Sequence, residues 1–196
     1  MLKKVKKILI VLCCLFALTS GVVFADTETN STYTETDKPL WTIHIEGYTF
    51  TYDNAPKQVK EEYKAKCEEM GIAPSPKAEI FIPSDEMQSY GLKDYKKIPD
   101  GFDIYFYGTY FKVTGQKNYT VTTSTLVGYN KIESGNPVHL AQILLKTCGY
   151  SIGVDSQFGN ETYTRVRSFQ SSNGLGVDGI VGARTWERLA YKASIS

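Results

Sequence analysis

The chain has 196 residues, and its 22 lysine and arginine residues nearly balance its 21 aspartate and glutamate residues, for a formal net charge of +1. This balance does not indicate the basic surface that nucleic-acid binding requires, so we predict no nucleic-acid partner. The length fits one or two small domains.

Residues 1–25 have the pattern of a signal peptide. Basic residues precede an apolar run from Ile8 to Leu18 that is shorter than a membrane-spanning helix, and small residues lead to a cleavage site before Asp26. We therefore expect a secreted protein with no stable membrane span after cleavage; an uncleaved anchor is the alternative. Removing the four lysines of this segment leaves 22 − 4 = 18 basic and 21 acidic residues, a net charge of −3.

After the signal peptide we expect a disordered spacer and then a hairpin. Residues 26–39 contain hardly any apolar side chains and are predicted to form a disordered spacer. From Trp41 to Tyr52, apolar residues alternate with polar ones on both sides of Glu46-Gly47. This pattern predicts a hairpin whose turn lies at those two residues.

A helix is predicted after this hairpin. Asn54 is placed to cap it, and it runs to about Met70 and stops at Gly71. Apolar residues at helical spacing form its buried stripe, which consists of Val59, Tyr63, Cys67 and Met70.

Strands are predicted again beyond residue 78. Residues 79–82 favour a short strand, and the aromatic-rich and threonine-rich segments 103–113 and 119–127 favour a second hairpin with its turn at 115–118. Residues 40–132 are therefore predicted to form a small α+β domain with an antiparallel sheet and one helix. We expect it to be an interaction module with a protein partner, and its sequence indicates no family.

The C-terminal region contains an internal repeat. Residues 153–163 and 176–186 align without gaps, and five of the eleven positions are identical. Each copy is predicted to form a turn and then a helix capped by a glycine, Gly159 or Gly182, with a threonine at the third helical position. Two such corners would pack three helices together, so residues 133–196 are predicted to be an all-α domain that begins near Ser134–Pro137.

This region resembles the type 1 peptidoglycan-binding domain over about residues 137–191. The resemblance is carried by Gly149-Tyr150, by the patterns Phe-Gly-x-x-Thr from Phe158 and Asp-Gly-x-x-Gly-x-x-Thr-Trp from Asp178, and by Phe169-Gln170. It implies a three-helix fold, binding to peptidoglycan through the glycan strand or the stem peptide, and a location at the bacterial cell wall. The chain departs from the family at Ala141, Ser156 and Arg165, where leucine, glycine and a small residue are usual.

Most residues of the repeat are predicted to be scaffold, because aspartate and glycine are the residues that such turns require. Recognition of a glycan or peptide would use exposed aromatic, amide or guanidinium groups instead. The candidate ligand-binding residues are Tyr150, Gln157, Tyr163, Arg165 and Gln170.

The sequence contains no complete catalytic set of a zinc or cysteine enzyme. Its two histidines, His44 and His139, fall in different predicted domains, and Cys67 lies on the buried stripe of the predicted helix. We therefore predict no metal, no cofactor and no catalytic residues. Cys67 and Cys148 could form one disulfide after export, although both also fit buried helix positions as free thiols.

Two functions remain open. The first is a non-enzymatic wall protein that binds peptidoglycan through its C-terminal domain. The alternative is a peptidoglycan hydrolase of the glycosidase type, which would need two aspartate or glutamate side chains converging in a cleft of residues 40–132.

Overall fold

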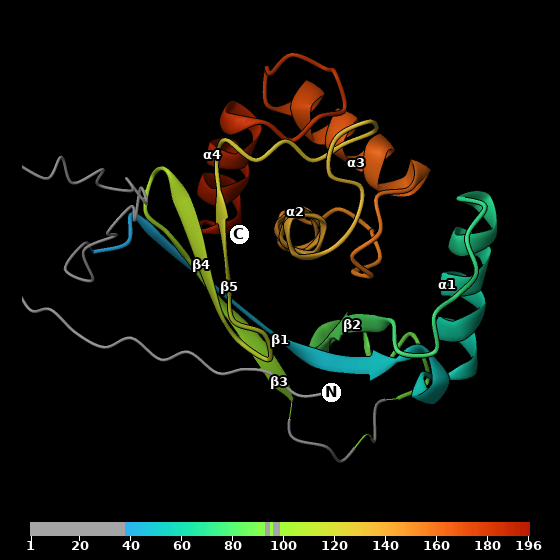
Figure 1. The fold of residues 1–196 in the computed structure, drawn as a ribbon. Helices are drawn as coiled ribbons and strands as arrows, with labels where there is room; N and C mark the ends of the chain where they lie inside the picture. Colours follow the sequence, from blue (N-terminus) through green and yellow to red (C-terminus); the bar gives the residue numbers. More distant parts are fainter. Residues whose placement is uncertain (1–37, 93–94, 96–98) are drawn as a thin grey trace, which may run out of the picture. The chain divides into compact units, whose positions relative to one another are not determined.

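The computed structural model describes residues 38–92, 95 and 99–196. The predicted signal peptide and all but the last two residues of the predicted spacer lie outside the described residues. The described residues form an antiparallel sheet of five strands in the order β2-β1-β3-β4-β5, together with four α-helices (Figure 1). The elements are β1 (Trp41–Thr51), α1 (Lys57–Glu69), β2 (Glu79–Pro83), β3 (Asp100–Phe106), β4 (Tyr110–Gly115), β5 (Tyr119–Thr122), α2 (Asn136–Thr147), α3 (Asn160–Ser172) and α4 (Ala183–Ala193). The predicted α+β class, with the sheet before the three C-terminal helices, is confirmed.

The first predicted hairpin is wrong, because Trp41–Thr51 is one continuous strand. β1 pairs with β3 up to Gly47 and with β2 from Gly47 onward. Within this strand the apolar positions change from odd to even residue numbers. Ile43 packs in the cluster with the C-terminal helices, whereas Phe50 packs in the cluster with α1. These residues lie seven positions apart on one strand, so they point to opposite faces of the sheet. The phase change marks an exchange of buried faces instead of a turn.

Gly47 is required where β1 changes partners. A Cβ atom at this position would overlap the carbonyl oxygen of Ile82 and the ring of Phe81 on β2. The residue that was expected to form a turn therefore allows close approach of two strands.

The predicted helix forms, but it begins later than expected. Asn54 lies in a 3₁₀ turn, Tyr52–Asn54, and Pro56 occupies the N-cap position of α1. The ring of Pro56 disfavours helical backbone at the preceding Ala55, which is extended with ψ 152°. The helix ends near the predicted position, and Gly71 follows it with a positive φ of 67°.

The second hairpin is confirmed at its turn and corrected in its length. Residues between Gly115 and Tyr119 join β4 to β5. The aromatic segment before them contains two strands, because the chain also turns between Phe106 and Tyr110. Gly108 has a φ of 88° in that turn.

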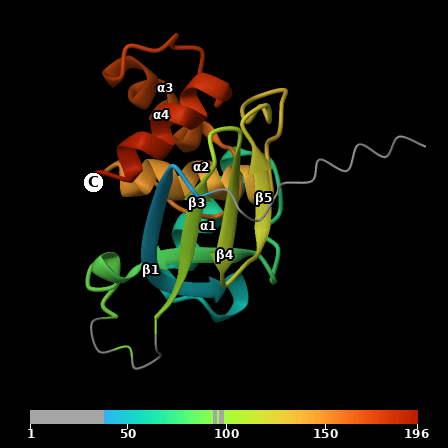
Figure 2. The same ribbon diagram turned by 90° about the vertical axis from the view of Figure 1, so that its left-hand side faces the viewer.

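The helix α2 lies at the centre of the main hydrophobic cluster. All residues from Val138 to Leu145 are buried, and α2 contacts β5, α3 and α4. Figure 2 shows it behind the sheet. Large side chains of the sheet, including Phe102 and Phe111, share this cluster with Phe158 and Trp186 of the helical region. Residues on both sides of position 132 thus contribute to one core, while the division into two domains stays a prediction. No helix among the described residues is long and apolar enough to cross a membrane.

Candidate ligand-binding site

In each copy of the repeat, a buried glutamine side chain hydrogen-bonds the turn to a helix. In the first corner, Gln142 of α2 donates from Nε2 to Asp155 Oδ1 at 2.8 Å and to the Gln157 carbonyl oxygen at 2.9 Å. Its Oε1 accepts the backbone N–H groups of Asp155 and Ser156 at 3.0 and 2.8 Å. The carboxylate of Asp155 also accepts the N–H of Gln157 at 3.0 Å. The turn is therefore tied to the middle of α2.

The second corner repeats this arrangement with Gln170 of α3. Its Nε2 donates to Asp178 Oδ1 at 2.8 Å and to the Ile180 carbonyl oxygen at 2.9 Å. Its Oε1 accepts the Gly179 N–H at 2.9 Å. Gln170 is only 1 % exposed, so its side chain lacks the exposure expected of a ligand-binding residue. It serves as scaffold, because its amide is already occupied.

The alignment of the two copies could not reveal the glutamines. Gln142 lies 13 residues before Asp155, whereas Gln170 lies only 8 residues before Asp178. The glutamines belong to helices that end at different distances from their turns, so they fall out of register. The predicted glycine caps are present: Gly159 precedes α3 and Gly182 precedes α4, both with extended backbone.

Ion pairs connect the first corner to the sheet region. Lys66 of α1 lies 3.1 Å from Asp155 and 2.5 Å from Glu161, and Lys146 of α2 lies 2.8 Å from Glu86. Burial disfavours the charged form of Lys66, but the two carboxylates outweigh this effect and raise its pKa. We interpret these charges as structural, since each lysine is matched by a carboxylate.

The four other predicted ligand residues are not brought together. Tyr150 packs its ring against Phe169 at 6.0 Å, and Arg165 donates from Nε to the Ser151 carbonyl oxygen at 2.8 Å. Gln157 lies beside α1 near Lys66. Tyr163 lies apart from them, on a different stripe of α3.

Tyr163 lines a shallow hollow along α3. We call it the α3 hollow; it measures about 540 Å³ and is lined by Tyr163, Thr164, Arg167, Ser168, Ser171 and Ser172. Arg167 Nη1 donates to the Tyr163 hydroxyl at 2.9 Å, and its guanidinium lies 5.5 Å from the ring centre. The ring centre of Tyr129 lies 5.2 Å from that of Tyr163. Arg167 was missed by the sequence analysis, although its position four residues after Tyr163 places both on one helix face.

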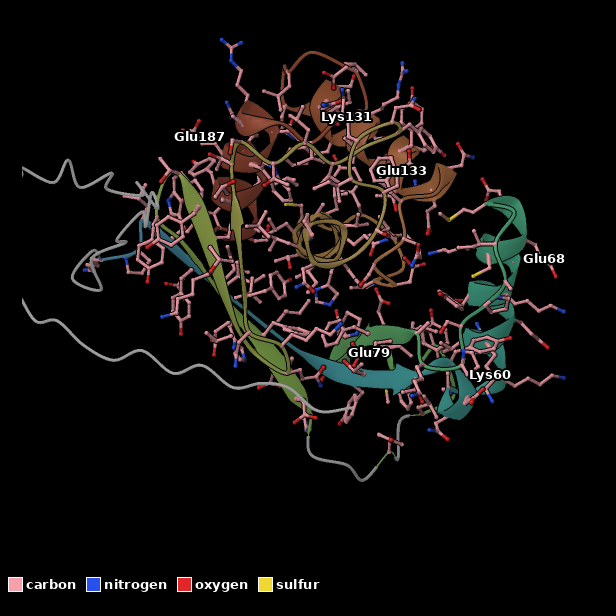
Figure 3. The ribbon with its side chains drawn as sticks, viewed as in Figure 1. Lys60, Glu68, Glu79, Lys131, Glu133 and Glu187 are labelled. Carbon is pink, nitrogen blue, oxygen red and sulfur yellow. The ribbon has the colours of Figure 1, made fainter. Side chains whose placement is uncertain are left out.

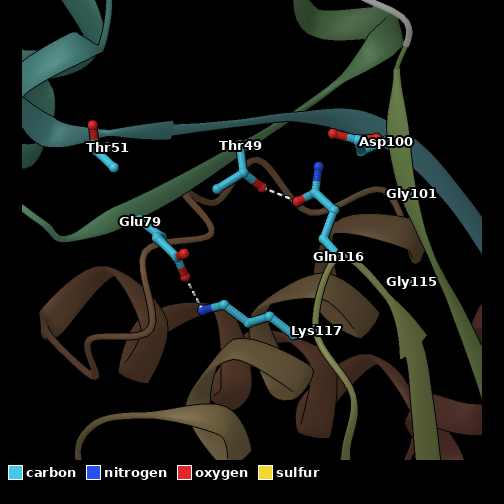
Figure 4. Close-up of a pocket in the computed structure, with 8 residues that line it drawn as sticks. All are labelled: Thr49, Thr51, Glu79, Asp100, Gly101, Gly115, Gln116 and Lys117. Carbon is cyan, nitrogen blue, oxygen red and sulfur yellow. Dashed lines mark hydrogen bonds and ion pairs between the residues drawn. The ribbon is translucent and has the colours of Figure 1, made fainter.

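A second hollow of about 460 Å³ lies at the sheet (Figure 4). Its lining contains two carboxylates, Glu79 and Asp100, and Glu79 forms an ion pair with Lys117. The strand register places Glu79 opposite Thr51 and Asp100 opposite Gly47, so the two acids flank β1 on different sides and four residues apart. Figure 4 shows Glu79 turned towards Lys117 and away from Asp100. The two acids do not converge on one point.

The remaining reactive groups are separated or inaccessible. Cys67 and Cys148 are free thiols, and burial raises the pKa of both, to about 11 for Cys148. His44 is exposed and pairs with Asp103, whereas His139 is buried and shares a hydrogen bond with Tyr119. Among residues 38–92, 95 and 99–196, no group of three or more histidine, cysteine, aspartate or glutamate side chains could hold a metal ion. Glu61, Glu62, Glu68 and Glu69 of α1 are exposed, and Lys64 and Glu68 form an i,i+4 ion pair at 3.6 Å; Figure 3 shows Glu68 pointing outward.

The helices α2, α3 and α4 and the two corners between them form the three-helix arrangement that the resemblance to the type 1 peptidoglycan-binding domain implied. Residues 134–189 match the family described as "Putative peptidoglycan binding domain". Residues 42–97, for which the sequence had indicated no family, match a second family described as "Putative peptidoglycan-binding domain".

Similar proteins agree with these matches. A peptidoglycan-binding protein from Clostridioides difficile, whose crystal structure was solved in complex with glutamine hydroxamate, is 33% identical with a TM-score of 0.66; the match covers 78% of this chain and 96% of that one. The chain therefore belongs to the peptidoglycan-binding domain family. A protein from Kitasatospora aureofaciens, named "Uncharacterized protein in bpoA1 3'region", is 41% identical over 64 residues. The match covers 32% of this chain and 54% of that protein, so the chain spans about half the length of this curated relative.

Proposed function

We propose that the protein is exported, associates with the bacterial cell wall and binds peptidoglycan without cleaving it. The observation that carries this proposal is that two separate segments, 42–97 and 134–189, each match a peptidoglycan-binding family. The Clostridioides difficile relative was solved with glutamine hydroxamate, an amino-acid derivative. This supports the stem peptide as one part of the ligand.

The proposed contact surface is the α3 hollow. A tyrosine ring beside an arginine offers an apolar surface and a fixed cation, and four hydroxyl side chains line the rest of the hollow. A stem peptide carries carboxylates for the arginine and amide groups for the hydroxyls. Further contacts outside this hollow are proposed for Tyr150, Gln157 and Arg165. For Gln170 we propose only a structural role, in which its side-chain amide holds the second turn.

The direct test is sedimentation of the mature protein with purified peptidoglycan. We expect wild type to sediment and Arg167→Gln to bind about tenfold more weakly, because an arginine contact of this kind contributes roughly 1–2 kcal/mol. Lys131→Gln, which removes the positive charge of an exposed residue that does not line the hollow, should bind like wild type. If the wild-type protein stays in solution, the proposed function is wrong.

The same incubation tests the hydrolase alternative. Soluble muropeptides should not accumulate if the protein only binds. Release of muropeptides that is lost in Glu79→Gln or Asp100→Asn would establish a glycosidase in the sheet hollow and contradict our proposal.

A further inference from the structure

A third hollow lies where the beginning of β1 meets α4, and we call it the α4 hollow. It measures about 530 Å³, and its lining comes from β1, from the loop after α3 and from α4. The lining residues are Trp41, Leu175, Arg184, Glu187, Arg188 and Tyr191. This volume falls within the range of about 300–1,000 Å³ that is usual for small-ligand sites. None of the predicted ligand residues belongs to it.

The aromatic side of the hollow is held in place by the sheet. The ring of Trp41 stacks on the buried Phe106 at a centroid distance of 5.2 Å and an interplanar angle of 3°. Tyr191 lies 5.7 Å from Trp41 at an angle of 59°, and it is 41% exposed. Phe106 covers one face of the Trp41 ring and restrains its orientation. The two rings therefore form a fixed and partly exposed apolar surface.

The charged side of the hollow comes from one face of α4. Arg184 and Arg188 are four residues apart, so they lie one above the other, and both are exposed. Neither guanidinium forms a hydrogen bond or ion pair with any described residue. Glu187, which Figure 3 shows on the outer side of α4, leaves a local charge of +1. The hollow thus presents two unengaged guanidinium groups beside an aromatic surface.

This combination selects a particular ligand chemistry. Aromatic rings pack against the C–H faces of sugar rings, and the planar guanidinium donates two parallel hydrogen bonds to a carboxylate. A neutral sugar would use only the rings, and a simple carboxylate would use only the arginines. A sugar that carries a carboxylate would use both.

We propose that the α4 hollow binds a carboxylate-bearing sugar unit, namely N-acetylmuramic acid whose lactyl carboxylate carries no stem peptide. The sugar ring packs on Trp41 and Tyr191, and the carboxylate pairs with Arg184 and Arg188. This inference rests on the proposed function, because it names the part of peptidoglycan that a second surface recognises. It assigns glycan without stem peptides to this hollow, whereas the α3 hollow is assigned the stem peptide.

Tryptophan fluorescence can report binding at this hollow. The chain has two tryptophans. Trp186 is fully buried, and its Nε1 donates to the Thr125 carbonyl oxygen at 2.8 Å. A change of emission on adding ligand therefore reports on Trp41.

The experiment titrates the protein with three soluble ligands. These are the disaccharide N-acetylglucosaminyl-N-acetylmuramic acid, the same disaccharide with its stem peptide attached, and the neutral disaccharide of N-acetylglucosamine. We expect the free acid to change the emission, and the other two to bind about tenfold more weakly or not at all. Arg188→Gln and Tyr191→Ala should each weaken binding of the free acid about tenfold. Lys131→Gln, which removes the positive charge of an exposed residue that lines neither hollow, is the matched control and should bind the free acid like wild type.

The outcomes separate this inference from the proposed function. Equal binding of the neutral disaccharide would overturn the carboxylate assignment, and equal binding of the peptide-bearing form would overturn the preference for free muramic acid. If the wild-type protein sediments with peptidoglycan but the free acid gives no signal, or gives one that Arg188→Gln and Tyr191→Ala leave unchanged, the inference is wrong and the proposed function stands. If wild type does not sediment, the proposed function is what fails. Circular dichroism of each variant checks that it is folded.

Discussion

Corresponding residues of the two repeat copies do not always have the same physical role. A Cβ at Gly153 would displace the ammonium group of Lys66, whereas a Cβ at the corresponding Gly176 would meet no atom within 4 Å. Ser156 and Gly179 also correspond, and both have positive φ, of 62° and 75°. The second corner uses glycine for this conformation, but the first corner holds a serine in it. The first corner is therefore the more strained of the two.

Replacing Ser156 with glycine should stabilise the protein. We expect Ser156→Gly to raise the free energy of unfolding by about 0.5–1 kcal/mol, because the relief of left-handed strain exceeds the entropy that glycine adds to the unfolded chain. Urea denaturation monitored by circular dichroism measures this. Ser156→Ala keeps a Cβ atom at positive φ and should give no such gain. An equal gain from both variants would show that the hydroxyl, and not the backbone, is the source of strain.

At the scale of elements, each corner is a turn fixed to a helix by one amide side chain. The first corner satisfies two backbone N–H groups and one buried carboxylate through Gln142. Loss of that amide would leave the backbone N–H groups of Asp155 and Ser156 without their partner, which costs far more than the hydrogen bonds contribute on balance. Substitution of Gln142 should therefore destabilise the corner strongly, whereas substitution of exposed neighbouring residues should have little effect on its stability.

Gln142→Leu should destabilise the protein by about 2–4 kcal/mol, since it keeps the volume of the side chain and removes its polar atoms. Gln157→Ala is the control, because only the backbone of Gln157 takes part in the network. The control should change the unfolding midpoint in urea only slightly. If Gln142→Leu were as stable as wild type, water would have to replace the hydrogen bonds that Gln142 makes to the turn.

The errors of the sequence analysis also lie at this scale. Local chemistry correctly located the glycine caps at Gly159 and Gly182 and the stop near Gly71, since each depends on backbone conformation within a few residues. The hairpin at Glu46-Gly47 failed because the alternation of β1 reflects which helices cover it, and this information is not local. Gln170 was a candidate ligand residue, and its burial also depends on packing that is not local.

At the scale of the whole molecule, a buried histidine joins the sheet to the central helix. His139 of α2 is 3% exposed and shares a hydrogen bond of 2.8 Å with the hydroxyl of Tyr119 on β5. The ring of Phe102 on β3 lies 4.9 Å away. Burial, together with the positive charge of Lys117, lowers the pKa of His139 to about 3. The imidazole is thus neutral where the sheet meets α2.

The stability of the protein should fall as the pH drops below about 6.5. The unfolded chain protonates this histidine near pH 6.5, whereas the folded protein resists protonation down to about pH 3. The unfolded state then binds more protons, so unfolding should become easier by about 2 kcal/mol between pH 7 and pH 5. Urea denaturation at several pH values measures this slope.

The two histidines provide a matched comparison. His139→Asn should remove the destabilisation at low pH. The other histidine of the chain, His44, has its pKa raised chiefly by the hydrogen bond to Asp103, so its stabilising effect is present at low pH and is lost as the pH rises through its folded pKa. His44→Gln should therefore make the fall towards pH 5 steeper. A slope that survives His139→Asn would show that another group is responsible.

The sequence by itself determined the features that depend on neighbouring residues: the two glycine-capped corners, the helices between them and the resemblance to a peptidoglycan-binding domain. Backbone conformation and helical spacing are local properties, and a single chain displays them directly. Only the tertiary structure decided which face of β1 is buried and that Trp41 meets Tyr191 beside two arginines. It also showed that Gln142 and Gln170 hold the two turns of the repeat by hydrogen bonds. Burial, pKa and the lining of a hollow depend on side chains that lie far apart in sequence, so packing has to bring them together first.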